Sequence, residues 1–554
     1  MIQLGISAFY HDSAACIVQD GKVLAAAEEE RFTEIKHDSS FPVNAIAYVL
    51  SEAGIENLND INEVCWYEKP KVKKNRVLKT FNKHIFKTFR SRCIFLYNYY
   101  FNSPKNLLKR HFQYKGLIKY TDHHLSHAAF SYFISPYKKA AILTVDGVGE
   151  WETITISKGV GPDVTKMYSI DFPNSLGMLY STITAYLGFK PNEGEYKVMG
   201  LAPFGNPTKY FNKLSKIFDK KQYLKIDQKY FTWEYSKEVM FDLEFCMLLG
   251  IPPRLKEEPI TQDHKDLAAA LQKIYEREFE KLVYKAKELT DSPNICLGGG
   301  CAYNGVANVL AYKHFKSVFI PFAPSDAGSA IGACLVNDPY SGYAVDNSTP
   351  YLGNGYTYNE IKKILINYKD KVTAEYFDYD KLVVRTAEII NNQKIVAWFQ
   401  GRMEFGARAL GNRSILASPR DASMRDKLNR VIKKREGFRP FAPSVTVNQA
   451  STWFDLQQSV PYMNMVLQAK TNKFQAATHI DGSCRVQTVD KYQNKLYYNL
   501  LKELGKISGA EVVLNTSYNL KDQTITRTPE QAIERFLDSD IDHLVIDKLI
   551  VTKK

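Results

Sequence analysis

A chain of 554 residues, 45% hydrophobic and 24% charged, has the composition of a globular protein with two or more domains. No apolar run approaches the ~18 residues that a membrane-spanning helix needs, and the strand-like N-terminus lacks a basic signal region, so we expect a cytoplasmic protein without a membrane anchor. The eight cysteines form no CxxC pair, which is typical of reduced core cysteines.

Three short apolar runs open the chain, at residues 2–7, 14–19 and 23–28. The last two are joined by Asp20-Gly21, a dipeptide typical of a tight hairpin turn, so we expect three strands of one sheet. A helix is predicted next, because Pro42 stands at its first turn, apolar residues follow at helical spacing and Gly54 lies just past its end.

The segment from Lys69 to Tyr120 holds fifteen Lys or Arg and no acid, so it more than accounts for the net charge of +13. Aromatic residues are interleaved with these cations, a pattern that suits binding of nucleic acid or of an acidic partner surface. The alternative, which we favour, is a basic amphipathic helical insertion whose Lys and Arg stems lie over their own domain.

His123 and His127 stand four residues apart, so on a helix they share one face and can bind a single cation. With eleven histidines in the chain, such a pair also arises by chance. Two carboxylates favour the metal interpretation: Asp146 ends the apolar run 140–145, and Asp326 follows the apolar run 317–322. Two imidazoles and two carboxylates suit Fe(II), Mn(II) or Zn(II).

The run that ends at Asp146 begins a repeat of the opening pattern, with further runs at 151–157 and 167–170. An acidic bend follows the first run of each set, His11-Asp12-Ser13 in one and Asp146-Gly147 in the other. This duplication is what an actin-like domain of two ribonuclease H-type lobes would show.

Residues 205–262 are rich in Lys, Tyr and Phe, and we expect a mostly helical insertion there. A long helix is predicted over residues 265–287, followed by a strand that ends in Gly298, Gly299 and Gly300. Glycines at such a turn let backbone N–H groups approach a phosphate at a helix N-terminus. A tight strand-to-helix turn uses glycines as well, so both interpretations stay open.

A polar stretch near residues 340–360 is the expected domain boundary, and the residues beyond it suffice for one more α/β domain. There, cations and small polar groups recur in loops flanked by predicted strands, as a pocket for a phosphorylated substrate requires. They are Arg408, Lys433, Arg439, Arg485, Asn515 and Ser517. A solvated basic face is the alternative, but the arginines lie among Gly, Phe and Pro in loops, not on the polar face of a helix.

Five motifs occur in order along the chain: GISAFYHDSAA at residues 5–15, EEERF at 28–32, HHLSHAA at 123–129, GEYKVMGLAP at 194–203 and FGARALGNRS at 405–414. Together they resemble the O-carbamoyltransferases of antibiotic and nodulation-factor biosynthesis, the NodU/CmcH family, and the resemblance covers nearly the whole chain. The basic aromatic segment departs from the plainer family pattern.

The resemblance implies an actin-like domain related to TsaD-type carbamoyl-transferring proteins over residues 1–355, and a YrdC-like α/β domain over residues 375–554. In this family the YrdC-like domain converts carbamoyl phosphate and ATP to carbamoyl-adenylate, and Mg²⁺ accompanies the ATP. The N-terminal domain then passes the carbamoyl group to a hydroxyl. By motif position, the six C-terminal residues named above would hold carbamoyl phosphate and the nucleotide, with Arg408 and Lys433 acting in catalysis. His123, His127, Asp146 and Asp326 would bind an iron-type metal, Fe(II) in our expectation.

An attacking hydroxyl must lose its proton, and His11 is our candidate for the base. A loop histidine can instead hydrogen-bond substrate or close its turn. Gly298, Gly299, Gly300 and Asn304 are candidates for holding the adenylate. We expect the acceptor to be a small-molecule natural product with a hydroxyl, and expect neither nucleic acid nor a membrane as partner. A homodimer is considered, and the oligomeric state stays open.

Other functions share parts of this pattern. A tRNA threonylcarbamoyl-adenosine enzyme uses the same two fold types and would explain the basic segment through phosphate contacts, but fusion of both domains in one chain counts against it. Hydrogenase-maturation carbamoyltransferases resemble zinc-finger proteins in part, and this chain has no CxxC pair. A non-enzymatic, nucleotide-gated scaffold of the actin-like class would need neither the paired histidines nor the C-terminal arginines.

Overall fold

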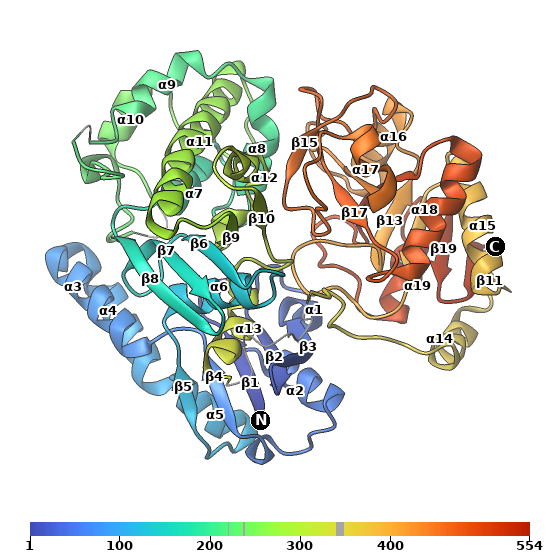
Figure 1. Cartoon of the computed structure of the whole chain (residues 1–554), viewed down its shortest axis with the longest axis horizontal. Coiled ribbons are helices and arrows are strands. Elements are labelled where there is room, and N and C mark those ends of the chain that lie inside the picture. Colours follow the sequence, from blue (N-terminus) through green and yellow to red (C-terminus); the bar gives the residue numbers. More distant parts are fainter. Residues whose placement is uncertain (220, 237–238, 339–347) are drawn as a thin grey trace. The chain divides into compact units, whose positions relative to one another are not determined.

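The computed structural model describes residues 1–219, 221–236, 239–338 and 348–554, and the chain divides into two compact units (Figure 1). Unit 1 comprises residues 1–29 and 37–348, and unit 2 comprises residues 30–36 and 349–554. In unit 2, Arg527 Nε donates to the carbonyl of Arg31 at 3.1 Å, and Arg535 pairs with Glu34 at 3.5 Å. The sequence did not indicate that the short segment 30–36 belongs with the C-terminal half of the chain.

Unit 1 contains two five-stranded sheets of the same topology. The first consists of β1 (Ile2–Ser7), β2 (Ala14–Gln19), β3 (Lys22–Glu28), β4 (Glu63–Trp66) and β5 (Ile118–Tyr120). The second consists of β6 (Lys139–Val145), β7 (Glu152–Val160), β8 (Asp163–Asp171), β9 (Asn294–Gly298) and β10 (Ser317–Phe319). In each sheet three strands form an antiparallel meander and two continue in parallel, with the orders β3-β2-β1-β4-β5 and β8-β7-β6-β9-β10. The predicted duplication is confirmed by this repeated strand order.

The predictions of a hairpin turn and two helices in unit 1 are also confirmed. The Asp20-Gly21 turn joins β2 to β3 with φ values of 49° and 77°, as a two-residue type I′ hairpin requires. The two predicted helices are α2 (Val43–Glu52) and α11 (Gln262–Thr290). Unit 1 also contains α7 (Leu176–Tyr186), α8 (Glu195–Leu201) and α12 (Gly305–Asn308).

Two helices, α6 (His123–Phe133) and α13 (Asp326–Asn337), form the layer between the sheets (Figure 1). Helix α6 packs against β6 and β9, α13 packs against β1 and β2, and the two helices pack against each other. Glycines permit this close approach. A Cβ atom on Gly332 would lie 1.8 Å from the carbonyl oxygen of Ser126, and one on Gly5 would lie 2.1 Å from that of Ala330.

We expect Gly332→Ala to lower the melting temperature by several degrees, because overpacking a core costs about 1–3 kcal/mol and the clashing atom is backbone. That cost outweighs the gain of about 1 kcal/mol that alanine brings to a helix. Differential scanning fluorimetry measures the shift. The control is Gly437→Ala, whose added Cβ meets nothing within 4 Å. Equal melting temperatures for both variants would contradict the close packing of α6 on α13.

The two insertions of unit 1 differ from each other. The basic aromatic segment, residues 69–120, forms the predicted helices α3 (Pro70–Lys83), α4 (Ile85–Phe101) and α5 (Pro104–Phe112). The described part of residues 205–262 holds only two short α-helices, α9 (Thr208–Ser215) and α10 (Leu243–Leu249), so the expectation of a mostly helical insertion was wrong. Side chains of Asp219 and Asp227 accept N–H groups two residues further on, which favours turns over helix.

Unit 2 is built on an eight-stranded sheet with the order β11-β20-β19-β12-β13-β18-β14-β17. Its strands are β11 (Val372–Tyr376), β12 (Val396–Phe399), β13 (Arg413–Ala417), β14 (Ala442–Thr446), β17 (Gln487–Val489), β18 (Val512–Ser517), β19 (His543–Ile546) and β20 (Leu549–Lys553). A separate pair joins β15 (Val466–Gln468) to β16 (Ser483–Arg485). The helices are α1 (Glu30–Thr33), α14 (Tyr358–Leu365), α15 (Tyr379–Asn391), α16 (Ala422–Lys427), α17 (Val447–Trp453), α18 (Lys495–Ser508) and α19 (Pro529–Leu537).

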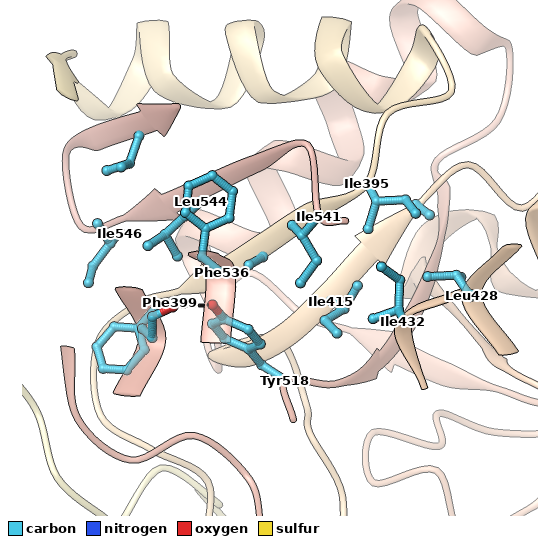
Figure 2. Close-up of a cluster of buried hydrophobic side chains, with 14 of the residues drawn as sticks. Ile395, Phe399, Ile415, Leu428, Ile432, Tyr518, Phe536, Ile541, Leu544 and Ile546 are labelled. Carbon is cyan, nitrogen blue, oxygen red and sulfur yellow. Dashed lines mark hydrogen bonds between the residues drawn. The ribbon is translucent and has the colours of Figure 1, made fainter. Parts of the chain in front are cut away.

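One face of this sheet is covered by a buried core that includes Phe399 of β12, Ile415 of β13, Leu544 of β19 and Phe536 of α19 (Figure 2). Tyr518 lies in the same cluster and donates its hydroxyl to the carbonyl of Ala532. Both units thus combine sheets with packed helices, and the predicted α/β class is confirmed. Among the described residues, no helix is both long and apolar enough to pass through a bilayer.

Candidate metal centre and anion site

The four predicted ligands come together at one point of unit 1. His123 and His127 lie one turn apart on α6, Asp146 directly follows β6, and Asp326 is the first residue of α13. The Nε2 of His123 lies 2.9 Å from Asp146 Oδ2 and 3.2 Å from the Nε2 of His127. The Nε2 of His127 lies 3.3 Å from Asp326 Oδ1. All four ligand atoms lie within 4.8 Å of one another.

This arrangement fits a small divalent cation. Ligand atoms about 2.1 Å from a tetrahedral or octahedral metal are separated by about 3.0–3.4 Å, close to the distances found here. Both carboxylate oxygens of Asp326 are inaccessible to solvent, and Oδ1 lies 3.3 Å from the Nε2 of His127 and 3.7 Å from that of His123. A buried carboxylate without a full set of hydrogen bonds is costly, and a cation would relieve that cost. The donor set of two imidazoles and two carboxylates is hard enough to exclude a preference for copper(I).

A second layer of contacts orients the ligands. The Nδ1 of His127 lies 2.9 Å from Ser329 Oγ, and Asp146 Oδ1 accepts the N–H of Gly300 at 3.1 Å. The carboxylate of Glu150 accepts the backbone N–H of His123, at the start of α6, at 3.1 Å. We did not predict Ser329 or Glu150. Glu150 was detectable as an acid just after the Asp146 bend, whereas the contact of Ser329 depends on tertiary packing.

Opposite charges in the cluster shift one another's pKa values. Burial lowers the pKa of His127, but its interactions with Asp146 and Asp326 outweigh burial and raise the pKa to about 9. Burial raises the pKa of Asp146, but hydrogen bonds with His123 and His127 bring it well below its usual value. Asp146 is therefore ionised at neutral pH, as a metal ligand must be.

His11 lies in the loop after β1, where its Nδ1 is 3.0 Å from Asp12 Oδ2. Burial lowers the pKa of His11, but Asp12 and, more weakly, Asp326 and Asp146 raise it to about 10. With these carboxylates charged, His11 keeps its proton at neutral pH and is a hydrogen-bond donor. A cation held by Asp146 and Asp326 would offset part of that charge and favour the neutral base.

A cavity of about 1870 Å³ adjoins the cluster, with His123 and Asp326 among its lining residues. All its lining residues belong to unit 1, and many come from α3 and α4 of the basic aromatic segment. The cavity therefore borders two of the four candidate ligands.

The turn after β9 is explained by packing. Gly299 has a φ of 84°, and a Cβ there would lie 2.2 Å from the carbonyl oxygen of Val145. A Cβ on Gly298 would lie 2.4 Å from Ser131 Oγ. Asn304 exchanges two 3.1 Å hydrogen bonds with the side-chain amide of Gln272. A nucleotide contact at these positions stays a prediction.

In unit 2, Lys433 is buried and donates to neutral oxygens, at 2.9 Å to the carbonyl of Asn519 and 2.7 Å to its side-chain oxygen. Its Nζ also lies 3.5 Å from Ser517 Oγ, so two of the predicted residues are neighbours. Burial, together with the positive charges of Arg435 and Arg439, holds the pKa of Lys433 well below its usual value. This is a cationic cluster in a low-dielectric setting, which an anionic ligand would stabilise.

The other predicted groups of unit 2 have different surroundings. Burial and the positive charge of Arg408 hold the pKa of Arg485 well below its usual value. Asn515 lies within the sheet and donates to Gln487 at 3.0 Å, which is a structural contact. Glu404, which we did not predict, accepts the N–H groups of Leu410 and Asn412 at 2.7 Å and shapes the loop that carries Arg408.

Comparison with known proteins adds to this geometry. Residues 2–335 match the family model described as carbamoyltransferase N-terminus, and residues 387–553 match the one described as carbamoyltransferase C-terminus. An uncharacterized protein of Synechocystis is 38% identical over 99% of this chain and 96% of its own length. The nodulation protein NolNO of Sinorhizobium fredii is 34% identical over 99% of this chain and 79% of its own. A 3'-hydroxymethylcephem-O-carbamoyltransferase of Amycolatopsis lactamdurans is 34% identical over 46% of this chain and 47% of its own.

Proposed function

Because the chain belongs to the carbamoyltransferase family, we propose that it carbamoylates a hydroxyl of a small-molecule natural product, by way of carbamoyl-adenylate formed from carbamoyl phosphate and ATP. The observation that carries the proposal is the buried set of two histidines and two aspartates beside a large cavity. The O-carbamoyltransferase among the relatives supports a hydroxyl as the acceptor.

The transfer step belongs to unit 1 in this proposal. His123, His127, Asp146 and Asp326 would hold a divalent metal, Fe(II) in our expectation, which supplies a Lewis acid able to polarise a carbonyl. The acceptor oxygen forms a bond to the carbamoyl carbon, the bond from that carbon to the AMP oxygen breaks, and AMP leaves. The hydroxyl proton must go to a base, and His11 has that role if it enters the step neutral. The turn Gly298 to Gly300 and Asn304 would hold the adenylate.

The activation step belongs to unit 2, which we propose to be YrdC-like. Water releases phosphate from carbamoyl phosphate, an oxygen of the resulting carbamate bonds to the α-phosphorus of ATP, and pyrophosphate leaves as carbamoyl-adenylate forms. Carbamoyl phosphate and ATP are both polyanions, so their approach requires several converging cations. Lys433 with Arg439, and Arg408 with Arg485, supply such cations in buried or partly buried positions. Ser517 beside Lys433 adds a hydroxyl donor, while Asn515 acts from within the sheet. Mg²⁺ would accompany ATP.

The direct test is the dependence of ATP consumption on carbamoyl phosphate. We expect the purified chain to release pyrophosphate from ATP when carbamoyl phosphate is present and not when it is omitted. Adenylate formation requires both substrates, so omitting ATP and omitting carbamoyl phosphate should give the same background level of pyrophosphate. ATP turnover that is independent of carbamoyl phosphate would favour the nucleotide-gated scaffold instead.

A further inference from the structure

The cavity beside the metal centre has a wall of unusual composition. Its cations all come from the basic aromatic segment, and they are Lys69, Lys71, Lys73, Arg76, Lys87 and Lys105. Apart from the metal ligand Asp326, the acids in the lining are Glu68 and Glu234. Aromatic rings from several elements complete the wall, among them Trp66, Tyr67, Phe81, Phe95, Tyr99 and Phe172. The cavity thus offers ring faces together with an excess of positive charge.

Some of these cations are already engaged within unit 1. Lys69 pairs with Asp122 at 2.8 Å, and Lys73 pairs with Glu68 at 2.8 Å. The ammonium of Lys87 lies 4.4 Å from the ring centre of Tyr235. These contacts account for part of the basic segment as an insertion that packs on its own unit, the interpretation we favoured from sequence.

Arg76 is different. Its guanidinium lies 5.1 Å from the ring centre of Phe172, and its Nε is inaccessible to solvent and has no hydrogen-bond partner among the residues the structure describes. Burial lowers the pKa of Arg76, and the nearby Glu68, already bound to Lys73, only partly opposes this shift. Arg76 nevertheless lines the cavity and is partly exposed, so the accessible part of its guanidinium is a binding group for an anion.

The size of the cavity bears on the ligand as well. Sites for small ligands usually measure about 300–1,000 Å³, and this one measures about 1870 Å³. It has room for an acceptor of two or more rings. The aromatic walls suit the flat apolar faces of such rings.

We propose that the acceptor is a large amphipathic molecule with an anionic group, which Arg76 binds while the hydroxyl to be carbamoylated reaches His123 and Asp326. This inference rests on the proposed function, which it deepens by giving the chemical class of the acceptor. Polycationic acceptors such as aminoglycosides are disfavoured, because their amines would lie against like charges in this lining.

Two fluorescent dyes with the same aromatic scaffold provide the test. Anilinonaphthalene sulfonate carries an anionic group, and phenylnaphthylamine lacks it. We expect the full chain to bind the sulfonate at least about tenfold more tightly, since a hydrogen bond to a charged group is at stake. Arg76→Gln should remove this preference by weakening binding of the sulfonate alone. Equal binding of both dyes, or a preference that survives in Arg76→Gln, would overturn the proposal.

The matched control is Arg110→Gln, since Arg110 is exposed on α5, in the same segment, and does not line the cavity. It should keep the preference, and melting temperatures should show that both variants are folded. Displacement separates ligand classes: a hydroxymethylcephem carboxylate should displace the sulfonate dye, and an aminoglycoside should not. Salt-sensitive displacement by transfer RNA would overturn the small-molecule assignment in favour of nucleic acid.

These readouts are independent of catalysis. If the dye preference and its loss in Arg76→Gln are found, but pyrophosphate release does not depend on carbamoyl phosphate, the anion site stands and the proposed function fails. If pyrophosphate release behaves as expected and both dyes bind equally, the proposed function stands and the assignment of an anionic acceptor fails.

Discussion

Replacing His127 with alanine should remove the bound metal and reduce carbamoyl transfer by about a thousandfold or more, while pyrophosphate release that depends on carbamoyl phosphate continues. The Nε2 of His127 lies within 3.7 Å of ligand atoms on His123, Asp146 and Asp326, so its loss opens the cluster. A Lewis acid contributes several kcal/mol to a transition state, and each 1.36 kcal/mol corresponds to a factor of ten in rate. The cations that we propose for adenylate formation lie in unit 2 and should be unaffected.

Metal content and the two partial reactions should be measured on the same preparation. Elemental analysis gives the metal bound per chain, a coupled assay gives pyrophosphate, and mass spectrometry gives carbamoylated product from a panel of hydroxyl compounds. His124→Gln is the matched control. His124 is the adjacent buried histidine, and its Nδ1 faces Thr155 at 3.3 Å, so it should keep the metal. Loss of both partial reactions in His127→Ala alone would contradict the division of labour between the two units.

The grouping of the four candidate ligands could be predicted because its signals are local. A spacing of four residues places His123 and His127 on one helix face whatever the tertiary structure is. Asp146 directly follows an apolar run. If that run is a strand, the next side chain lies at the edge of the sheet. Asp326 was harder to place, because it does not directly follow a strand. It is the first residue of α13, which begins several residues after β10 ends. Both carboxylates reach the same place because β6 and β10 each run parallel to β9, so their carboxyl ends lie at one edge of the second sheet.

Features that depend on distant contacts could not be predicted. The contact of Ser329 with His127 requires α13 to lie on α6. Gly332 permits this close packing, but a glycine in the sequence does not predict it. Residues of α3 and α4 form much of the cavity lining, which hydrophobic periodicity alone does not reveal. Segment 30–36 joins unit 2 through Arg527 and Arg535, some five hundred residues away in sequence.

Replacing Lys433 with methionine should reduce pyrophosphate release by about 10²–10³, the usual cost of removing one group that stabilises developing charge. The side chain keeps its length and loses its charge, so the buried volume is nearly conserved. Lys434→Met is the matched control, because Lys434 is the adjacent lysine and is exposed. If Lys434→Met lost as much activity as Lys433→Met, a general electrostatic effect would replace the specific role of Lys433.

Lys433→Arg should retain the activity that Lys433→Met loses. It should also shift the alkaline limb of the pH–rate profile. A lysine is charged below its pKa, and burial with neighbouring Arg435 and Arg439 holds the pKa of Lys433 well below the ordinary value. In the free enzyme this charge is therefore lost as pH rises through the lowered pKa, and kcat/KM for carbamoyl phosphate should fall at a lower pH than an exposed lysine would allow. A guanidinium stays charged throughout that range, so the descending limb should move to higher pH in Lys433→Arg. Bound phosphate would raise the pKa of Lys433, so kcat should show a smaller difference between the two enzymes than kcat/KM. Identical alkaline limbs in kcat/KM would mean that Lys433 is not the cation that receives the phosphate.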